Sequence, residues 1–342
     1  MSHLFSPIDI RGLRLKNRIV MPPMASYTGT EEGYVTPETS EYYRVRAAGD
    51  VGLIIVEHTY ILPSGRRHRR QLGLVSDAHA RVLRPLVDEI HRHGAGAVIQ
   101  LTHAGARAAA DVIGQTPIAP STVNTSANDA NEPAAVAMDA HQIDQVIEAF
   151  VACARRAADA GFDGVELHGA HGYLLNQFMS PVTNMRTDEY GDGPEGRLLL
   201  PLRIIRAVRA AVGPELIVMY RLGADDGVPG GITPDDAREI APHLVDAGVD
   251  VIDVSGGLAG YQPFEWKGEG FFADISSRVK AVCGAPVIVT GGIKSPATAD
   301  SIIRRSKADL VGIGRALLKD PAWAVNARLE LGEPGAGGQV IR

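Results

Sequence analysis

The chain has little cysteine and no long apolar run, and both shortages narrow its possible functions. Its 342 residues include only Cys153 and Cys283, each in a stretch expected to be helical. Two cysteines supply neither a disulfide framework nor the ligands of an iron–sulfur cluster. No apolar run approaches the roughly 20 residues of a membrane-spanning helix, and the N-terminal MSHLFSPIDIRG lacks the basic-then-apolar order of a signal peptide. We therefore expect a cytoplasmic enzyme without a membrane partner.

The chain also lacks a large excess of charge of either sign. The net charge is −6, without a long acidic or basic run, which argues against nucleic acid as a main partner. Hydrophobic residues make up 45% of the chain and charged residues 22%, the balance of a globular protein with a sizeable core. The expected partner is a small-molecule substrate.

What the chain does contain is a regular series of β-branched runs. Stretches with helical spacing of apolar residues separate them. Short turns, such as Ala160-Gly161-Phe162-Asp163, lead from the end of a helix into the next strand. The eight predicted strands are 18–22, 52–57, 97–101, 164–168, 216–221, 249–255, 286–290 and 309–312.

Helix starts are marked by capping patterns. Asp139 and Gln142 form a capping box before an apolar face that includes Ile143, Val146 and Phe150. Thr233-Pro234 and Ser295-Pro296 have the pattern of an N-cap followed by proline at the first helical position.

Eight strand–helix units predict a single (β/α)₈ TIM barrel, an α/β fold. A doubly wound open sheet is the alternative, but that fold usually carries G-x-G-x-x-G after its first strand. Pro22-Pro23-Met24-Ala25 follows the first strand here, which favours the barrel. Residues 1–331 would form the barrel domain with an N-terminal β-hairpin within residues 1–16, and residues 332–342 a C-terminal tail.

Barrel active sites lie at the carboxyl ends of the strands, so the residues there are the candidates. Glycine-rich turns follow the last three strands, where backbone N–H groups and Arg315 could bind a phosphate. In chain order these strand ends carry Pro23 to Tyr27, Glu57-His58, Gln100 with His103, His168 with His171 and Tyr173, Arg221, Ser255-Gly256, Gly291-Gly292 and Gly314-Arg315.

His168, His171 and Tyr173 form the most informative group, at a predicted strand-to-helix turn. Two imidazoles and a phenol aimed at one point could polarise a carbonyl oxygen and deliver a proton nearby. Core or capping roles are the structural alternative for single histidines, and His-x-x-His could be half of a metal site. The first strand ends without His or Asp, and no carboxylate lies between the two histidines, so we assign no metal.

Over nearly its full length the chain resembles the old yellow enzyme family of FMN-dependent NAD(P)H oxidoreductases. Leu15 to Met24 and Gly312 to Pro321 match the family's two ends. The densest match is His168-Gly-Ala-His171-Gly-Tyr173-Leu, followed by Gln177-Phe178, Ser180-Pro181, Asn184, Arg186, Asp188, Tyr190-Gly191, Glu195 and Arg197.

The resemblance implies FMN as cofactor, NADPH or NADH as transient reductant, and ene-reductase activity on α,β-unsaturated carbonyl compounds. In that mechanism His168 and His171 bind the substrate oxygen, Tyr173 protonates the α-carbon, and Tyr27 lines the substrate side. The implied flavin contacts are Pro22, Pro23, Met24 and Ala25 along the ring, Gln100 and Arg221 at the pyrimidine, and Ser255, Gly256, Gly291, Gly292, Gly314 and Arg315 around the phosphate.

Two of the departures from the family pattern concern the expected pocket. Ala25 stands where relatives carry cysteine or threonine, so the flavin's redox tuning must differ. His58 stands where a small residue is usual; it would contact the flavin or narrow the pocket, with a packing role as the alternative. Relatives are often homo-oligomers, dimers or tetramers, and Arg342 could reach a neighbouring subunit's site.

Two other functions stay open at this stage. The first keeps the flavin but oxidises amines, as N-demethylase and amine dehydrogenase relatives do. The second is a flavin-free barrel such as an aldolase, which would need a buried lysine at a strand end. The predicted sixth strand has no lysine there, which disfavours this option.

Overall fold

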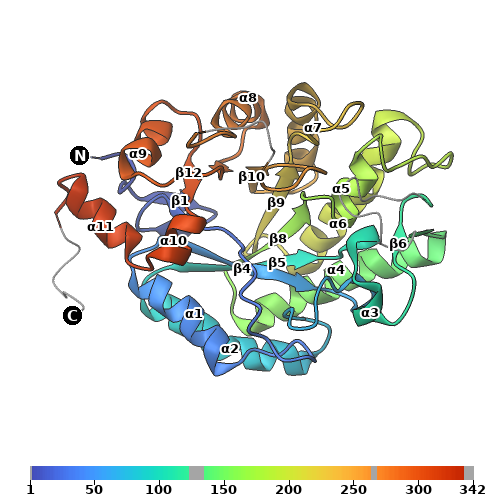
Figure 1. Cartoon of the computed structure of the whole chain (residues 1–342), viewed down its shortest axis with the longest axis horizontal. Coiled ribbons are helices and arrows are strands. Elements are labelled where there is room, and N and C mark those ends of the chain that lie inside the picture. The colour runs from blue at the N-terminus through green and yellow to red at the C-terminus, as the bar shows by residue number, and fades with distance from the viewer. Residues whose placement is uncertain (1, 123–134, 263–267, 335–342) are drawn as a thin grey trace.

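Eight parallel strands close into a barrel in the computed structural model, which describes residues 2–122, 135–262 and 268–334 (Figure 1). The strand that closes the ring, β12, pairs with β3, so the first and the last strands of the barrel lie side by side. In barrel order the strands are β3 (Ile19–Met21), β4 (Leu53–Tyr60), β5 (Gly96–Thr102), β8 (Gly164–Gly169), β9 (Ile217–Gly223), β10 (Val251–Ser255), β11 (Val287–Val289) and β12 (Leu310–Gly312). The predicted (β/α)₈ barrel is confirmed, and every predicted strand overlaps an observed one.

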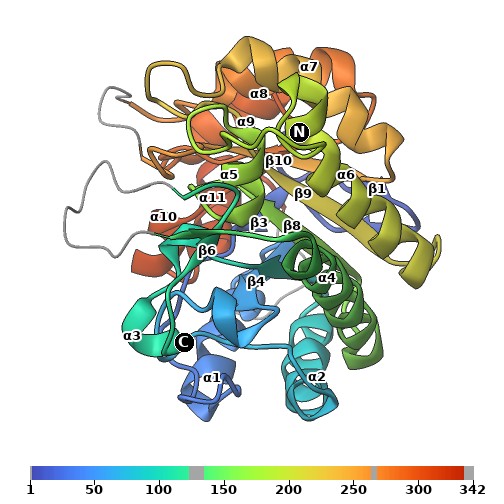
Figure 2. The same ribbon diagram turned by 90° about the vertical axis from the view of Figure 1, so that its right-hand side faces the viewer.

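Helices form the outer layer, and Figure 2 shows three of them, α2, α4 and α6, side by side on one flank. The longer helices are α1 (Pro37–Ala48), α2 (Asp77–Arg92), α4 (Ala140–Ala160), α6 (Gly193–Val212), α7 (Pro234–Asp246), α8 (Ala273–Cys283), α9 (Pro296–Arg304) and α11 (Trp323–Glu330). Shorter segments are η1 (Pro63–Gly65), η2 (Gly105–Arg107), α3 (Ala110–Ile113), α5 (Leu174–Met179) and α10 (Arg315–Lys319). Within the described ranges, none of these helices is long and apolar enough to cross a bilayer.

The predicted helix starts are confirmed. Asp139 Oδ1 accepts from the Gln142 backbone N–H at 2.8 Å, and Gln142 Oε1 accepts from the Asp139 N–H at 3.1 Å. Thr233 caps α7 with Asp236 in the same reciprocal way, and Ser295 caps α9. These side chains satisfy backbone donors that the first helical turn leaves unpaired.

The expected N-terminal hairpin consists of β1 (Ile8–Ile10) and β2 (Leu13–Leu15), which pair antiparallel. Ile10 and Leu15 pack against apolar side chains from the first halves of the barrel strands, including Val20, Val98 and Val251. The hairpin therefore covers the amino-terminal end of the barrel interior with apolar contacts.

Further along the strands, the buried side chains become polar. Gln100, Glu166, Arg221 and Asp253 are all buried. In three of the four strands the residue two positions earlier is apolar, namely Val98, Met219 and Val251. Register pairs Gln100 with Glu166, and Arg221 with both His168 and Asp253. Because buried polar groups need partners or a ligand, this change in polarity indicates which end of the barrel carries the chemistry.

Two features of the strands and loops were not predicted. Strand β4 runs three residues beyond the predicted end at Glu57, and its register against β5 shifts between Val56 and Thr59. From Val56 to Thr59 the chain advances three residues on β4, whereas the paired positions on β5, Ile99 and Leu101, are only two residues apart. One extra residue on one strand is the geometry of a bulge. In addition, β6 (Ile118–Ala119) and β7 (Val136–Ala137) form a small parallel sheet in the loop after β5.

Candidate active site

A pocket of about 390 Å³ lies at the carboxyl ends of the barrel strands. It brings together the predicted residues Pro22, Pro23, Met24, Ala25, Tyr27, His58, Gln100, His168, His171, Tyr173, Arg221, Gly291, Gly292, Gly314 and Arg315. Its lining also includes Tyr261, Gln262, Thr290, Ile293, Lys294, Gly312 and Leu318. Most of the latter lie one to three residues from a predicted position, so widening the predicted turns would have found them.

His168, His171 and Tyr173 come from the junction of β8 and α5, as predicted. The His168 ring centroid lies 4.9 Å from that of His171 and 4.9 Å from that of Tyr173, with the rings nearly perpendicular in both pairs. His171 has a left-handed backbone with φ of +59°, an uncommon conformation for a residue with a side chain. This local turn directs both imidazoles and the phenol into one pocket.

Both imidazoles are held neutral. Burial, then the neighbouring His171 and the Arg221 guanidinium, lowers the pKa of His168 well below its usual value. Burial, then Arg221 and Arg107, does the same for the pKa of His171. Burial raises the pKa of Tyr173, so its phenol stays protonated. The group therefore offers neutral N–H donors and one O–H acid.

Ser255 and Gly256, predicted at the phosphate, do not line the pocket. Ser255 Oγ lies 2.8 Å from His171 Nε2 and accepts from Arg221 at 3.4 Å. The Gly256 carbonyl accepts from the His171 backbone N–H at 3.1 Å, and a Cβ at Gly256 would lie 2.0 Å from the Gly260 carbonyl oxygen. Since the loop after β10 fills this turn, the prediction that these residues contact a phosphate is corrected: they support His171.

The turns after β11 and β12 retain their predicted access to the pocket. Gly291 and Gly292 have φ of +123° and +68°, and a Cβ at Gly292 would lie 2.8 Å from the Phe271 ring. The backbone N–H groups of Gly291, Gly292 and Gly314 have no hydrogen-bond partner in the described part of the chain. Arg315 begins α10 and donates to Gln262 at 2.7 Å. Free amide donors beside a guanidinium suit an anionic group such as phosphate.

A layer of buried ionisable groups lies under the pocket. Gln100 donates to Glu166 at 2.6 Å, and Arg221 Nε lies 3.3 Å from Asp253 Oδ2. Burial raises the pKa of both carboxyls, and in Glu166 the nearby Asp253 adds to the increase. One guanidinium can balance only one carboxylate, so we infer that the two acids share a proton at neutral pH.

Glu57 is a further buried acid, and its hydrogen bonds hold the wall of the pocket together. Its carboxylate accepts from the Ser26 hydroxyl at 2.5 Å and from the Tyr43 hydroxyl at 3.3 Å. Burial raises the pKa of Glu57 to about 7. These bonds attach the segment after β3, which includes Tyr27, to β4.

Two tyrosines stand at the rim of the pocket: Tyr27 is 59% exposed and Tyr261 is 66% exposed. Tyr27 packs on His68 with ring centroids 4.5 Å apart. Arg342 and most of the predicted tail lie outside the described residues.

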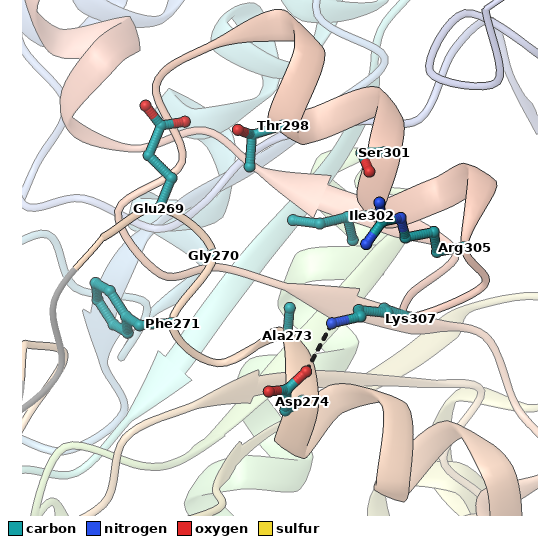
Figure 3. Close-up of a pocket in the computed structure, with 10 residues that line it drawn as sticks. All are labelled: Glu269, Gly270, Phe271, Ala273, Asp274, Thr298, Ser301, Ile302, Arg305 and Lys307. Carbon is teal, nitrogen blue, oxygen red and sulfur yellow. Dashed lines mark hydrogen bonds and ion pairs between the residues drawn. The ribbon is translucent and has the colours of Figure 1, made fainter.

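Another depression, of about 460 Å³, lies at α8 and α9 and shares no residue with the barrel-mouth pocket (Figure 3). Three of its charged groups are engaged within the protein: Lys307 pairs with Asp274 at 2.7 Å, and Glu269 accepts from the Ser295 backbone at 2.9 Å. It is larger, but the convergent imidazoles, phenol and free amides are all at the barrel mouth. We therefore place the active site there.

Known proteins resemble the chain over nearly its full length. The sequence profile of the NADH:flavin oxidoreductase / NADH oxidase family matches residues 3–333. The chain belongs to this family. The old yellow enzyme resemblance is confirmed, and with it FMN as the cofactor and NAD(P)H as the reductant of the family's oxidoreductases.

Individual relatives differ in length. The chain is 42% identical to an NADPH dehydrogenase of Geobacillus sp. (strain WCH70), covering 96% of this chain and 94% of that protein. It is 40% identical to an NADH oxidase of Thermoanaerobacter brockii over 95% of this chain, but spans only 50% of that relative.

Solved structures show the same barrel. Morphinone reductase in complex with tetrahydroNAD has a TM-score of 0.82 at 28% identity, with 98% and 93% of the two chains covered. Histamine dehydrogenase from Rhizobium sp. 4-9 has a TM-score of 0.85 at 27% identity, covering 96% of this chain and 48% of its own.

Proposed function

We propose that this protein reduces the C=C bond of α,β-unsaturated carbonyl compounds in a ping-pong cycle with NADPH or NADH. The observation that supports this most directly is the pair of neutral imidazoles beside a protonated tyrosine in one pocket. Such donors stabilise negative charge that develops on an oxygen, and the phenol supplies a proton to carbon.

The residues present fit FMN. Three backbone amides without partners and Arg315 suit its phosphate, whereas Gln100 and Arg221 would meet the pyrimidine edge and Pro22 to Ala25 would run along the ring. Arg221 is buried beside a carboxyl layer, so it would place fixed positive charge where the reduced ring is anionic. When bound, FMN supplies hydride transfer between the nicotinamide and the alkene.

The chain's own groups then act on the substrate. His168 and His171 hold the carbonyl oxygen, and their bonds strengthen as charge builds there, so they favour the transition state over the ground state. His171 Nε2 lies 2.8 Å from Ser255 Oγ, so Nδ1 is the nitrogen of His171 that would donate to the substrate, with Ser255 donating its own proton to Nε2. Tyr173 gives its proton to the α-carbon.

The test removes both donors. The double variant His168→Ala, His171→Ala should bind FMN but lose enone reduction and the binding of phenols, which place an oxygen at the same point. His141→Asn, on the exposed face of α4, is the matched control and should behave as wild type. Unchanged enone turnover in the double variant would refute the assignment.

Amine oxidation, as a flavin-dependent dehydrogenase or N-demethylase, is the second candidate, favoured by the likeness to the histamine dehydrogenase barrel. Anaerobic addition of N-methylated amines should leave the flavin absorbance unchanged if alkene reduction is the activity. Bleaching by amines, without reoxidation by enones, would support the amine dehydrogenase instead. A homo-oligomer in which Arg342 reaches a neighbour, and a cytoplasmic location, remain predictions.

A further inference from the structure

We propose that His58 is the hydrogen-bond donor of a second substrate subsite, one that binds an acceptor oxygen other than the oxygen held by His168 and His171. The substrate class is then alkenes activated from both sides, such as 1,4-dicarbonyl compounds. The proposal rests on alkene reduction as the function of the pocket.

His58 enters the pocket from a different direction than the histidine pair. It lies within the irregular register of β4, and bulges of this kind redirect side chains. In the barrel, β5 separates β4 from β8, which carries His168. The Tyr173 ring lies 5.8 Å from the His58 ring and 4.9 Å from the His168 ring, measured between centroids. The proton donor thus contacts both imidazoles.

The hydrogen bonds of Gln71 fix the tautomer of His58. Gln71 is fully buried, and its Oε1 accepts from the Arg67 backbone N–H at 2.7 Å. Its Nε2 lies 2.8 Å from His58 Nδ1 and 3.0 Å from the His58 carbonyl oxygen. If the Gln71 amide were flipped, its NH₂ group would face the Arg67 backbone N–H and its oxygen would face the His58 carbonyl oxygen, and neither pair could form a hydrogen bond. The Gln71 amide therefore donates to Nδ1, and His58 carries its proton on Nε2.

That Nε2–H has no partner from the protein in the part of the chain that the structure describes. His58 is 9% exposed, and the surface it keeps lines the pocket. Burial, and then the neighbouring His68 and Arg67, lower the pKa of His58 to about 3, so the ring is a neutral donor. The His68 ring packs edge-on against the His58 ring, with 5.5 Å between the two centroids, and limits reorientation of His58. A fixed donor that faces a pocket is best satisfied by an acceptor on the ligand.

A pair of five-membered rings tests the proposal in the FMN-loaded enzyme. N-methylmaleimide has two carbonyls across its alkene, whereas 2-cyclopentenone has one. His58→Phe keeps a ring but removes the donor, and should lower kcat/KM for the maleimide about tenfold more than for the enone, the size of one lost neutral hydrogen bond. Gln71→Met should change the ratio of the two kcat/KM values in the same direction but by less, because it removes the hydrogen bond that fixes the His58 tautomer and keeps the imidazole.

Binding and NMR provide readouts that do not require turnover. The saturated N-methylsuccinimide should bind more weakly to His58→Phe than to wild type, whereas binding of cyclopentanone should not change. In ¹⁵N spectra of histidine-labelled protein, His58 should show a pyridine-type Nδ1 and a pyrrole-type Nε2, and Gln71→Met should mix the two forms. His141→Asn is again the control.

The outcomes separate this proposal from the proposed function. Equal losses for both substrates, or weaker FMN binding with an unchanged substrate ratio, would show that His58 serves the fold or the flavin and would overturn the subsite. If wild type reduces neither alkene, the proposed function fails. The binding of N-methylsuccinimide and the tautomer of His58 then still test whether the subsite exists.

Discussion

Replacing Tyr173 with phenylalanine would separate proton delivery from the other properties of the pocket. The substitution removes one oxygen atom and retains the ring that packs against His168 and His58. Because burial raises the pKa of Tyr173, the wild-type phenol is in its acid form throughout the neutral range. Its loss should therefore reduce activity by the same factor across that range.

The expected magnitude follows from the role of a general acid. A positioned proton donor contributes roughly 10²- to 10⁴-fold to a rate, which corresponds to about 2.7 to 5.4 kcal/mol of transition-state stabilisation. Binding of an enone should change little, because His168 and His171 remain in place to hold the oxygen. Most of the loss should thus fall on kcat, with KM nearly unchanged.

The assay is stopped-flow absorbance of the flavin in its two half-reactions. Reduction by NADPH or NADH should proceed at the wild-type rate in Tyr173→Phe, since no proton from Tyr173 enters that step. Reoxidation by an enone should slow by the factor above. Wild-type rates in both half-reactions would refute Tyr173 as the acid, and a slowed first half-reaction would indicate a distorted pocket instead.

Two further predictions concern stability. Burial lowers the pKa of His103 to about 4 from its usual 6.5, so its neutral form stabilises the fold fully above pH 6.5, and this contribution is lost as the pH falls toward 4. His103→Gln should reduce the slope of unfolding free energy against pH in that window by about 1.4 kcal/mol per unit, as measured by denaturant titration; an unchanged slope would contradict a neutral His103. Asp139→Ala removes the capping box of α4 and should cost about 1 kcal/mol, whereas Asp139→Asn, which retains a capping oxygen, should restore most of it.

The sequence was sufficient for the barrel and for the cluster on β8, for a physical reason. Strand periodicity, capping pairs such as Asp139 with Gln142, and the spacing of His168, His171 and Tyr173 are local properties of the chain. The structure preserves them because parallel strands place their carboxyl ends at one rim. Most residues that line the pocket could therefore be predicted from their place at the carboxyl end of a strand.

What the sequence could not give depends on contacts between distant segments. Ser255 was expected at a phosphate, but its hydroxyl lies against His171 because the loop after β10 fills the turn behind it. The role of Gln71 was not foreseen, since its partner His58 lies thirteen residues away across an irregular strand end. Neither periodicity nor propensity reports a bulge or the orientation of a buried amide.

The pairing of β12 with β3 has a consequence for how the protein matures. During synthesis, the edge of β3 stays unpaired until residues 310–312 have left the ribosome. The segment Pro22 to Ala25 continues from one of these strands, and Gly314 and Arg315 follow the other. The proposed flavin site would therefore be assembled from the first and the last strands of the barrel to be made, and flavin uptake would have to wait for ring closure. The nascent chain carries an open strand edge until then.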